Sequence, residues 1–310
     1  MPAILTHYTF ALETLDNRSR VFEDVIRLGN QGPDVFMAYG TVPWRKRPDK
    51  KTINPVGAKM HHAKLYEVYG AMIDYALASP DREMLLAYIE ASYAHYALDR
   101  LAHAYIFYRS GFDENGELHG FYKWSHGTFE ALLDLALSKR KKTRISPYKC
   151  LLCDESRVKA ISKMWANCTN FGLNEDHFYL AYLDYVGGMK LIQSKTGWKR
   201  PVLRLLMGKN SAAHAQSMPG RLGKYKALDV ENLSHMEWRD PSTGETHTSS
   251  IDDMFALAHR DMKDLHELIN AARNGLNVKG ELKKWERSLD HDGTPYGDVK
   301  RYQELCWKQR

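Results

Sequence analysis

The chain has few cysteines and no long apolar run. Only 4 of its 310 residues are cysteine, too few for a disulfide framework, and such cysteine usage is typical of a reducing compartment. No uninterrupted apolar span of about 20 residues occurs, which argues against a membrane-spanning helix. The N-terminal segment has no basic start followed by a long apolar stretch, so it is a poor secretory signal. We therefore expect a cytoplasmic location.

Neither sign of charge is in large excess. Lys and Arg number 44 against 38 Asp and Glu, a net charge of +6. This excess is compatible with anionic substrates such as phosphodiesters but is too small, on its own, to indicate nucleic-acid binding. The sequence also lacks internal repeats, low-complexity segments and strand-rich stretches. Its apolar spacing is helical, so we expect an all-α multi-helix bundle: one domain over residues 1–275, with a polar C-terminal extension, 276–310, packing on it.

The strongest helical pattern covers residues 80–108, which are apolar and aromatic and predict a central buried helix. Within it His95, Asp99 and His103 are four residues apart and therefore share one face. A buried His or Asp is costly unless it is paired or bound to a metal. This helix alone leaves two alternatives open: a metal-binding face and a hydrogen-bonded His–Asp network in the core.

A second pair with the same spacing follows. His126 and Glu130 begin the next expected helix and are again four residues apart. Upstream, His7 lies near the start of the chain, and Asp34 lies in a turn rich in Gly and Pro. Either residue alone is more typical of a structural role. Taken together with the two helical pairs, they supply the mixture of nitrogen and oxygen ligands that a multinuclear zinc site needs.

Three further segments bear on the site. His61 and His62 open an expected helix over residues 60–77, and at most one of them serves a given metal, because neighbours on a helix face different directions. Residues 41–59 are basic and contain three prolines, which predicts a long surface loop of the kind that often borders a site. Cys150 and Cys153 form a lone CxxC, a weak signal for a zinc knuckle.

Assembled in order, these segments resemble the zinc-dependent phospholipase C family, in particular its compact bacterial branch without a signal sequence. The resemblance covers roughly residues 1–270 and rests on THY (His7), GNQGPDVF (Asp34), MHHAK (His61, His62), HYALDRLAH (His95, Asp99, His103) and HGTFE (His126, Glu130). The later segment HMEWRDPSTGETHTSSIDDMF is also similar to the family's C-terminal part. The same helical fold carries zinc-dependent single-strand nucleases.

The resemblance implies a cluster of two or three zinc ions. One zinc would be bound by His61, His95 and Asp99. A second would be bound by His103, His126 and Glu130, and a third by His7 with Asp99 shared. His61 is preferred to His62 because the family's ligand directly follows an apolar residue, here Met60. The short spacing from Asp99 to His103 departs from the secreted enzymes, which have more residues between these ligands.

The activity that the resemblance implies is phosphoric diester hydrolysis by a metal-activated water, which Asp34 would orient or deprotonate. The expected substrate is a phospholipid or a related phosphodiester, with possible peripheral contact to a membrane. The residues that bind the rest of the substrate are not identified. Two alternatives stay open: a zinc-dependent single-strand nuclease acting on nucleic acid, and a helical protein that binds metal without catalysis.

Overall fold

The computed structural model describes residues 4–14, 21–61, 63–111, 121–143, 145–194, 196–241 and 243–285. The elements of its first half are α1 (Ile4–Thr14), α2 (Glu23–Gly29), the 3-10 helix η2 (Gly32–Ala38), α3 (Lys50–Ile53), α4 (Val56–His61), α5 (Leu65–Ala78), α6 (Arg82–Ser110) and α7 (Phe121–Arg140). The second half contains α8 (Pro147–Cys150), α9 (Glu155–Cys168), α10 (His177–Ile192), α11 (Lys199–Met207), α12 (Ala212–Gln216), η3 (Gly223–Leu228), β1 (Trp238–Arg239), β2 (Thr246–His247), α13 (Ile251–Ala272) and α14 (Val278–Trp285).

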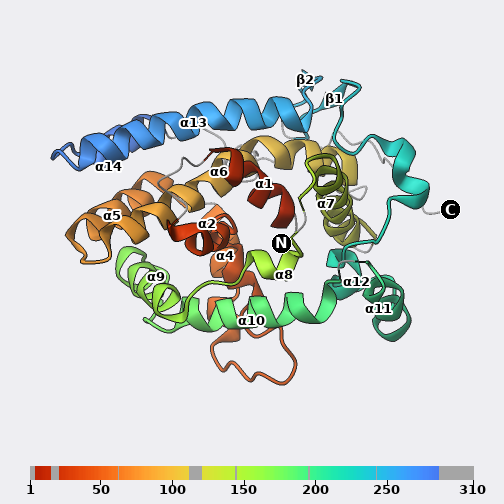
Figure 1. The fold of residues 1–310 in the computed structure, drawn as a ribbon, viewed down its shortest axis with the longest axis horizontal. Helices are drawn as coiled ribbons and strands as arrows, with labels where there is room; N and C mark the ends of the chain where they lie inside the picture. The colour runs from red at the N-terminus through yellow and green to blue at the C-terminus, as the bar shows by residue number, and fades with distance from the viewer. Residues whose placement is uncertain are drawn as a thin grey trace.

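The predicted all-α class is confirmed, since the strands among the described residues amount to one antiparallel pair of two-residue segments. In Figure 1, α13 lies along α6 at the top, α10 runs along the bottom, and α1, α2, α4 and α8 lie between them. Within the described part of the chain, no helix combines the length and the apolar character needed to cross a bilayer.

The long helix α6 forms the centre of the core, as its apolar and aromatic sequence predicts. Side chains along its whole length are buried, from Leu85 near its start to Tyr105 near its end. Different faces of α6 pack against α2, α5, α7 and α13. Because neighbours cover α6 on several sides, the polar side chains on it are held away from water.

The expected helix over residues 60–77 is instead two helices. α4 ends at His61 and α5 begins at Leu65, so His61 closes one helix rather than opening the other. α4 packs closely on η2, because a Cβ atom added to Gly57 would lie 2.6 Å from Met37 Cγ and 3.0 Å from the carbonyl oxygen of Pro33. This close approach brings the end of α4 beside the residues of η2.

Two helices of the second half also bear on the sequence analysis. α10 continues without interruption through Gly187 and Gly188 to Ile192. α13 begins after Ser250, which caps the helix and forms a capping box with Asp253. Beyond it, α14 packs on α5, and residues 286–310 of the expected extension lie outside the described residues.

Candidate metal centre

The predicted face of α6 points into the interior of the protein. His95, Asp99 and His103 are 1%, 2% and 9% exposed. Regular α-helical geometry over this segment places them one above the other. These three side chains meet residues from other parts of the chain. Together they form three groups of possible metal ligands.

The first group contains His7, His95 and Asp99. His7 comes from α1, and its Nε2 lies 2.9 Å from Asp99 Oδ1. On the other side of the carboxylate, His95 Nε2 lies 3.1 Å from Asp99 Oδ2. The two imidazole rings are close, with centroids 4.3 Å apart. Asp99 therefore presents both of its oxygens to ring nitrogens.

The backbone fixes the orientation of His95. Its Nδ1 lies 3.1 Å from the carbonyl oxygen of Asn30, and a carbonyl oxygen only accepts, so in a neutral ring Nδ1 carries the proton and the lone pair is on Nε2. This lone pair faces the ionised Asp99. A nitrogen lone pair and a carboxylate oxygen at such a distance repel each other unless a proton or a cation lies between them.

Close packing from η2 completes the seat of His95. Gly32 begins η2 with φ +50°, and a Cβ atom there would lie 2.3 Å from His95 Cδ2. Glycine tolerates the positive φ and leaves room for the imidazole ring. The segment from Asn30 to Gly32 therefore holds His95 in two ways. The Asn30 carbonyl oxygen contacts the ring nitrogen, and Gly32, which has no side chain, lets the backbone pack against the ring.

The second group contains Asp34, His61 and His95. Asp34 belongs to η2, and its Oδ1 lies 3.1 Å from Nε2 of His61 at the end of α4. The rings of His61 and His95 lie with centroids 6.2 Å apart. His95 is thus common to the first and second groups, which together form one continuous cluster.

The third group contains His103, His126 and Glu130. Glu130 Oε1 lies 3.2 Å from His126 Nε2, on the same helix α7, and 3.4 Å from His103 Nε2 on α6. Phe107, one turn beyond His103, contacts the ring of His126 at a centroid distance of 4.6 Å. His103 Nδ1 also lies 3.5 Å from Asp99 Oδ2, which links this group to the first.

The electrostatics favour ionised carboxylates. Burial alone would raise the pKa of Asp99, but its interactions with the His103, His95 and His7 rings hold it well below its usual range. For Glu130, burial is outweighed chiefly by His126, and the pKa is lowered to about 2. The pKa of Asp34 is lowered as well, with its hydrogen bond to His61 among the causes that oppose burial. For His7, burial and the neighbouring His95 lower the pKa and favour the neutral ring.

Two carboxylate oxygens test whether these residues suit a metal ion. Asp99 Oδ2 and Glu130 Oε2 are buried, and neither accepts a hydrogen bond from the described residues. A buried anionic oxygen without a donor is strongly destabilising. Carboxylate oxygens and neutral imidazole nitrogens are both ligands of divalent cations, so the donor set fits a bound metal ion.

The groups resemble those expected from the sequence but differ in membership. His103, His126 and Glu130 occur together, as the resemblance implies. His61, however, is grouped with Asp34 and His95 rather than with His95 and Asp99. His7 shares its group with Asp99, and His95 is the additional member.

The remaining candidates lie apart from these groups. His62 lies outside the described residues. Neither Cys150 nor Cys153 belongs to a possible metal group in the described part of the chain. Cys150 is buried in the core, and the thiol of Cys153 lies 3.4 Å from the Asp24 carboxylate.

Sequence reasoning missed Asp134, which lies one turn beyond Glu130 on α7. Its carboxylate accepts hydrogen bonds from the backbone amides of Leu5 (3.1 Å) and Thr6 (2.8 Å), and from Thr6 Oγ1 (2.8 Å). These amides lie in the first turn of α1, just before His7, so Asp134 caps that helix from a distance. The spacing of four residues from Glu130 was the signal that could have revealed it.

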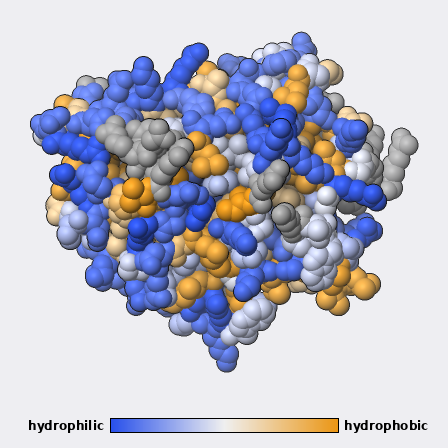
Figure 2. Space-filling view, viewed as in Figure 1, coloured by the Kyte–Doolittle hydropathy of each residue, from blue (hydrophilic) through white to orange (hydrophobic). Residues whose placement is uncertain are grey.

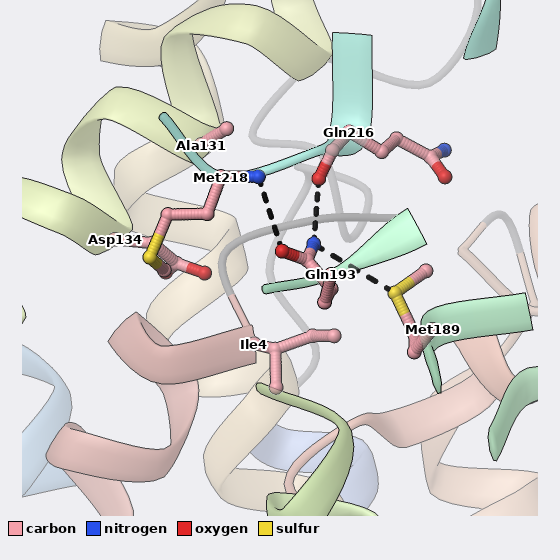
Figure 3. Close-up of a pocket in the computed structure, with 7 residues that line it drawn as sticks. All are labelled: Ile4, Ala131, Asp134, Met189, Gln193, Gln216 and Met218. Atoms are coloured by element: carbon pink, nitrogen blue, oxygen red, sulfur yellow. Dashed lines mark hydrogen bonds between the residues drawn. The ribbon is translucent and has the colours of Figure 1, made fainter. Parts of the chain in front are cut away.

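A small pocket lies beside Asp134 (Figure 3). It has a volume of about 10 Å³, enough for about one water. Gln193 closes it by accepting a hydrogen bond from the Met218 amide (3.0 Å) and donating one to the carbonyl oxygen of Gln216 (2.7 Å). These bonds tie the end of α10 to the end of α12 behind the site.

A much larger cavity, about 620 Å³, adjoins the third group. His126 and Glu130 are part of its wall, and the rest is mainly apolar, with Met37, Val42 and Ile192 among the lining side chains. Its volume lies in the usual range of small-molecule sites, about 300 to 1,000 Å³. The metal groups are therefore adjacent to a space that suits an apolar ligand.

The chain was compared with protein-family models, with curated proteins and with solved structures, and none of them matched.

Proposed function

We propose that the protein is a zinc-dependent phosphodiester hydrolase of the phospholipase C type. The observation that carries this proposal is convergence. Side chains from five separate motifs of the sequence meet in one largely buried cluster, which contains three groups of possible metal ligands. Each motif alone could have had a purely structural role. A structural hydrogen-bond network would not need three ionised carboxylates surrounded by imidazole rings, with two of the carboxylate oxygens lacking a donor.

Zinc is the metal we propose, because it prefers imidazole nitrogens together with carboxylate oxygens. Of the residues in the three groups, the ligands would be His7, His61, His95, Asp99, His103, His126 and Glu130. When bound in such a site, zinc lowers the pKa of a coordinated water and neutralises charge on phosphodiester oxygens.

The protein's own side chains would hold and orient the reactants. The ionised Asp99 and the neutral His7 supply ligand atoms without first losing a proton, because their pKa values favour these forms. We assign Asp34 to orient or deprotonate the attacking water from the edge of the cluster, where its carboxylate contacts His61. Most of the cluster is buried, which limits the access of bulk water to it.

The apolar cavity favours a lipid as substrate. His126 and Glu130 lie in its wall, so the phosphodiester would lie against the third group while acyl chains occupy the apolar space. A nuclease would need aromatic side chains on which bases stack. Among the described residues that line the cavity, Trp124 and Tyr185 are the aromatic ones apart from His126, whereas most of the others are aliphatic or Met.

The test combines metal analysis with two substrates. Protein purified without chelator should contain two or three zinc ions per chain by mass spectrometry, and it should release a phosphorylated head group from phosphatidylcholine. His95→Ala should abolish this release, whereas His266→Ala, at a half-exposed histidine outside the three groups, should retain it.

Three outcomes would contradict the proposal. Fewer than two zinc ions per chain would remove the multinuclear site. Digestion of single-stranded DNA without hydrolysis of phosphatidylcholine would favour the nuclease alternative. Full zinc occupancy with no turnover of either substrate would favour a protein that binds metal without catalysis.

A further inference from the structure

The short helix α11 (Lys199–Met207) exposes most of its apolar side chains. Only Leu203 of this helix is buried. The exposed apolar residues and their exposed fractions are Val202 (42%), Leu205 (85%), Leu206 (75%) and Met207 (57%). Figure 2 shows an orange area at its lower right, in the region where α11 lies in Figure 1. A contiguous apolar patch of this kind marks an interaction surface.

The segment around α11 carries charge of one sign. From residue 190 to residue 228 the sequence contains Lys and Arg throughout and neither Asp nor Glu. Lys190, Arg204 and Lys209 are exposed close to the apolar patch. A helix with exposed leucines and flanking basic side chains is typical of an element that lies in the surface of an anionic membrane.

The patch adjoins the large cavity beside the metal groups. Leu191 and Met207 line that cavity, yet they are 48% and 57% exposed, so the cavity wall reaches the surface at α11. Pro43 lines another part of the wall, and the next residue, Trp44, is 67% exposed. Exposed apolar side chains therefore occur at two separate edges of the cavity.

The loop that carries Trp44 is held firmly in place. Asp184 of α10 is fully buried and accepts hydrogen bonds from the Gly40 amide (2.8 Å) and from Arg47 Nε (3.0 Å) and Nη2 (3.0 Å). Arg45 Nη1 donates to the Leu183 carbonyl oxygen at 2.5 Å. Anchored neighbours thus present Trp44 to solvent, and an exposure of 67% is unusual for so large an aromatic side chain.

We propose that α11 and Trp44 form one docking surface for anionic lipid bilayers, with the leucines of α11 and the indole of Trp44 inserted among the lipids and the basic side chains on the head groups. The mouth of the cavity then faces the bilayer. The use of this surface to admit a lipid substrate rests on the proposed function. The binding itself does not, because it requires neither the metal groups nor hydrolysis.

The test is sedimentation of the full-length, metal-loaded protein with vesicles. The wild type should bind vesicles of phosphatidylcholine with phosphatidylserine, and it should bind vesicles of phosphatidylcholine alone more weakly. L205E/L206E should reduce partition into the anionic vesicles by about tenfold or more, because two apolar contacts become negative charges. L257E/L276E is the matched control, since it adds the same charges at leucines that are 42% and 44% exposed outside this surface.

Enzyme assays separate this inference from the proposed function. Short-chain phosphatidylcholine below its micelle concentration needs no bilayer, so L205E/L206E should hydrolyse it at the wild-type rate and lose activity only on vesicles. Wild-type binding to vesicles without hydrolysis of either form would overturn the proposed function and support the docking surface. Equal vesicle binding by wild type and L205E/L206E would overturn the docking surface.

A second copy of the chain is the alternative to lipid as the partner that covers this surface. Size-exclusion chromatography of the wild type and L205E/L206E distinguishes it from lipid. A wild-type dimer that L205E/L206E converts to a monomer, together with absence of vesicle binding, would assign the patch to a second copy of the chain and overturn the proposal.

Discussion

His95 is the residue on which the candidate site depends most. It belongs to two of the three metal groups, its Nδ1 contacts the carbonyl oxygen of Asn30, and Gly32 packs against its ring. The sequence predicted that His95 shares a face with Asp99, because spacing alone determines this. Its contact with Gly32 could not be predicted, since that contact depends on how η2 lies across α6.

Removing the His95 side chain should disrupt two groups at once. We expect His95→Ala to lose at least one bound metal ion and to lower kcat/KM by about 100-fold or more, because loss of a direct ligand should exceed the effect of losing a supporting contact. Metal analysis and an assay on phosphatidylcholine check this. Full metal content in the variant would contradict the assigned role.

Gly32→Ala tests the packing behind His95. The added Cβ would lie 2.3 Å from His95 Cδ2, and φ at this position is +50°. We expect a loss of about 2 to 3 kcal/mol in the free energy of unfolding, from the left-handed backbone and the steric overlap together, with weaker metal binding. Chemical denaturation and metal titration measure the two effects.

Gly172→Ala is the control for this substitution. Gly172 has φ +70°, but nothing lies within 4 Å of the position its Cβ would take. Gly172→Ala should therefore lose only the backbone contribution to the free energy of unfolding, about 1 kcal/mol, and it should keep normal metal affinity. Equal effects of the two substitutions would show that Gly32 does not position His95.

At the scale of elements, helical periodicity predicted which candidate ligands pair within one helix. It predicted few of the pairings between residues of different helices. The pairing of His126 with Glu130 follows from spacing along α7. The pairing of Asp34 with His61 does not, because it requires α4 to end at His61 and to pack on η2 through Gly57. That approach is a tertiary contact between short elements, for which the sequence carries no periodic signal.

Asp134 links α7 to the start of α1, and its titration gives a pH-dependent prediction. Burial, opposed by the hydrogen bonds from Thr6 and Leu5, raises the pKa of Asp134 from 3.8 to about 6 in the folded protein. A folded pKa above the unfolded value stabilises the protein fully below pH 3.8, and this contribution is lost as the pH rises towards 6. Its upper limit is about 3 kcal/mol.

Asp134→Asn removes this titration while keeping the shape of the side chain. The difference in free energy of unfolding between wild type and Asp134→Asn should therefore change between about pH 4 and pH 6, in favour of the wild type at the lower pH, and stay constant above pH 7. Urea denaturation at a series of pH values measures it. A difference that does not vary with pH would refute the raised pKa.

For the whole molecule, composition and periodicity predicted the helical class but not the cavity. The cavity wall combines residues from η2, the loop after it, α7, α10, α11 and α12. No single segment carries a signal for such a space, because it arises from the way distant helices fail to fill the volume between them. The candidate metal ligands could be found from the sequence, whereas the adjoining cavity could not.

Removal of metal should destabilise the whole fold. The cluster brings three ionised carboxylates into the core, and two of their oxygens, Asp99 Oδ2 and Glu130 Oε2, accept no hydrogen bond from the described residues. We expect a chelator to lower Tm by about 5 to 10 °C, as follows from losing a ligand present at about 100 times its Kd. Differential scanning calorimetry measures this, and added zinc should restore Tm. An unchanged Tm after verified removal of metal would contradict the assignment.

The order of the site along the chain has a consequence for how such a protein can diversify. Every proposed metal ligand lies between His7 and Glu130, whereas the far wall of the cavity comes from the stretch between Asp184 and Gln216. The candidate reactive centre is therefore encoded in the first half of the gene, whereas about half of the residues that line the cavity beside it come from the second half. Mutation or recombination in the second half can alter which molecules enter while the chemistry of the first half is inherited unchanged.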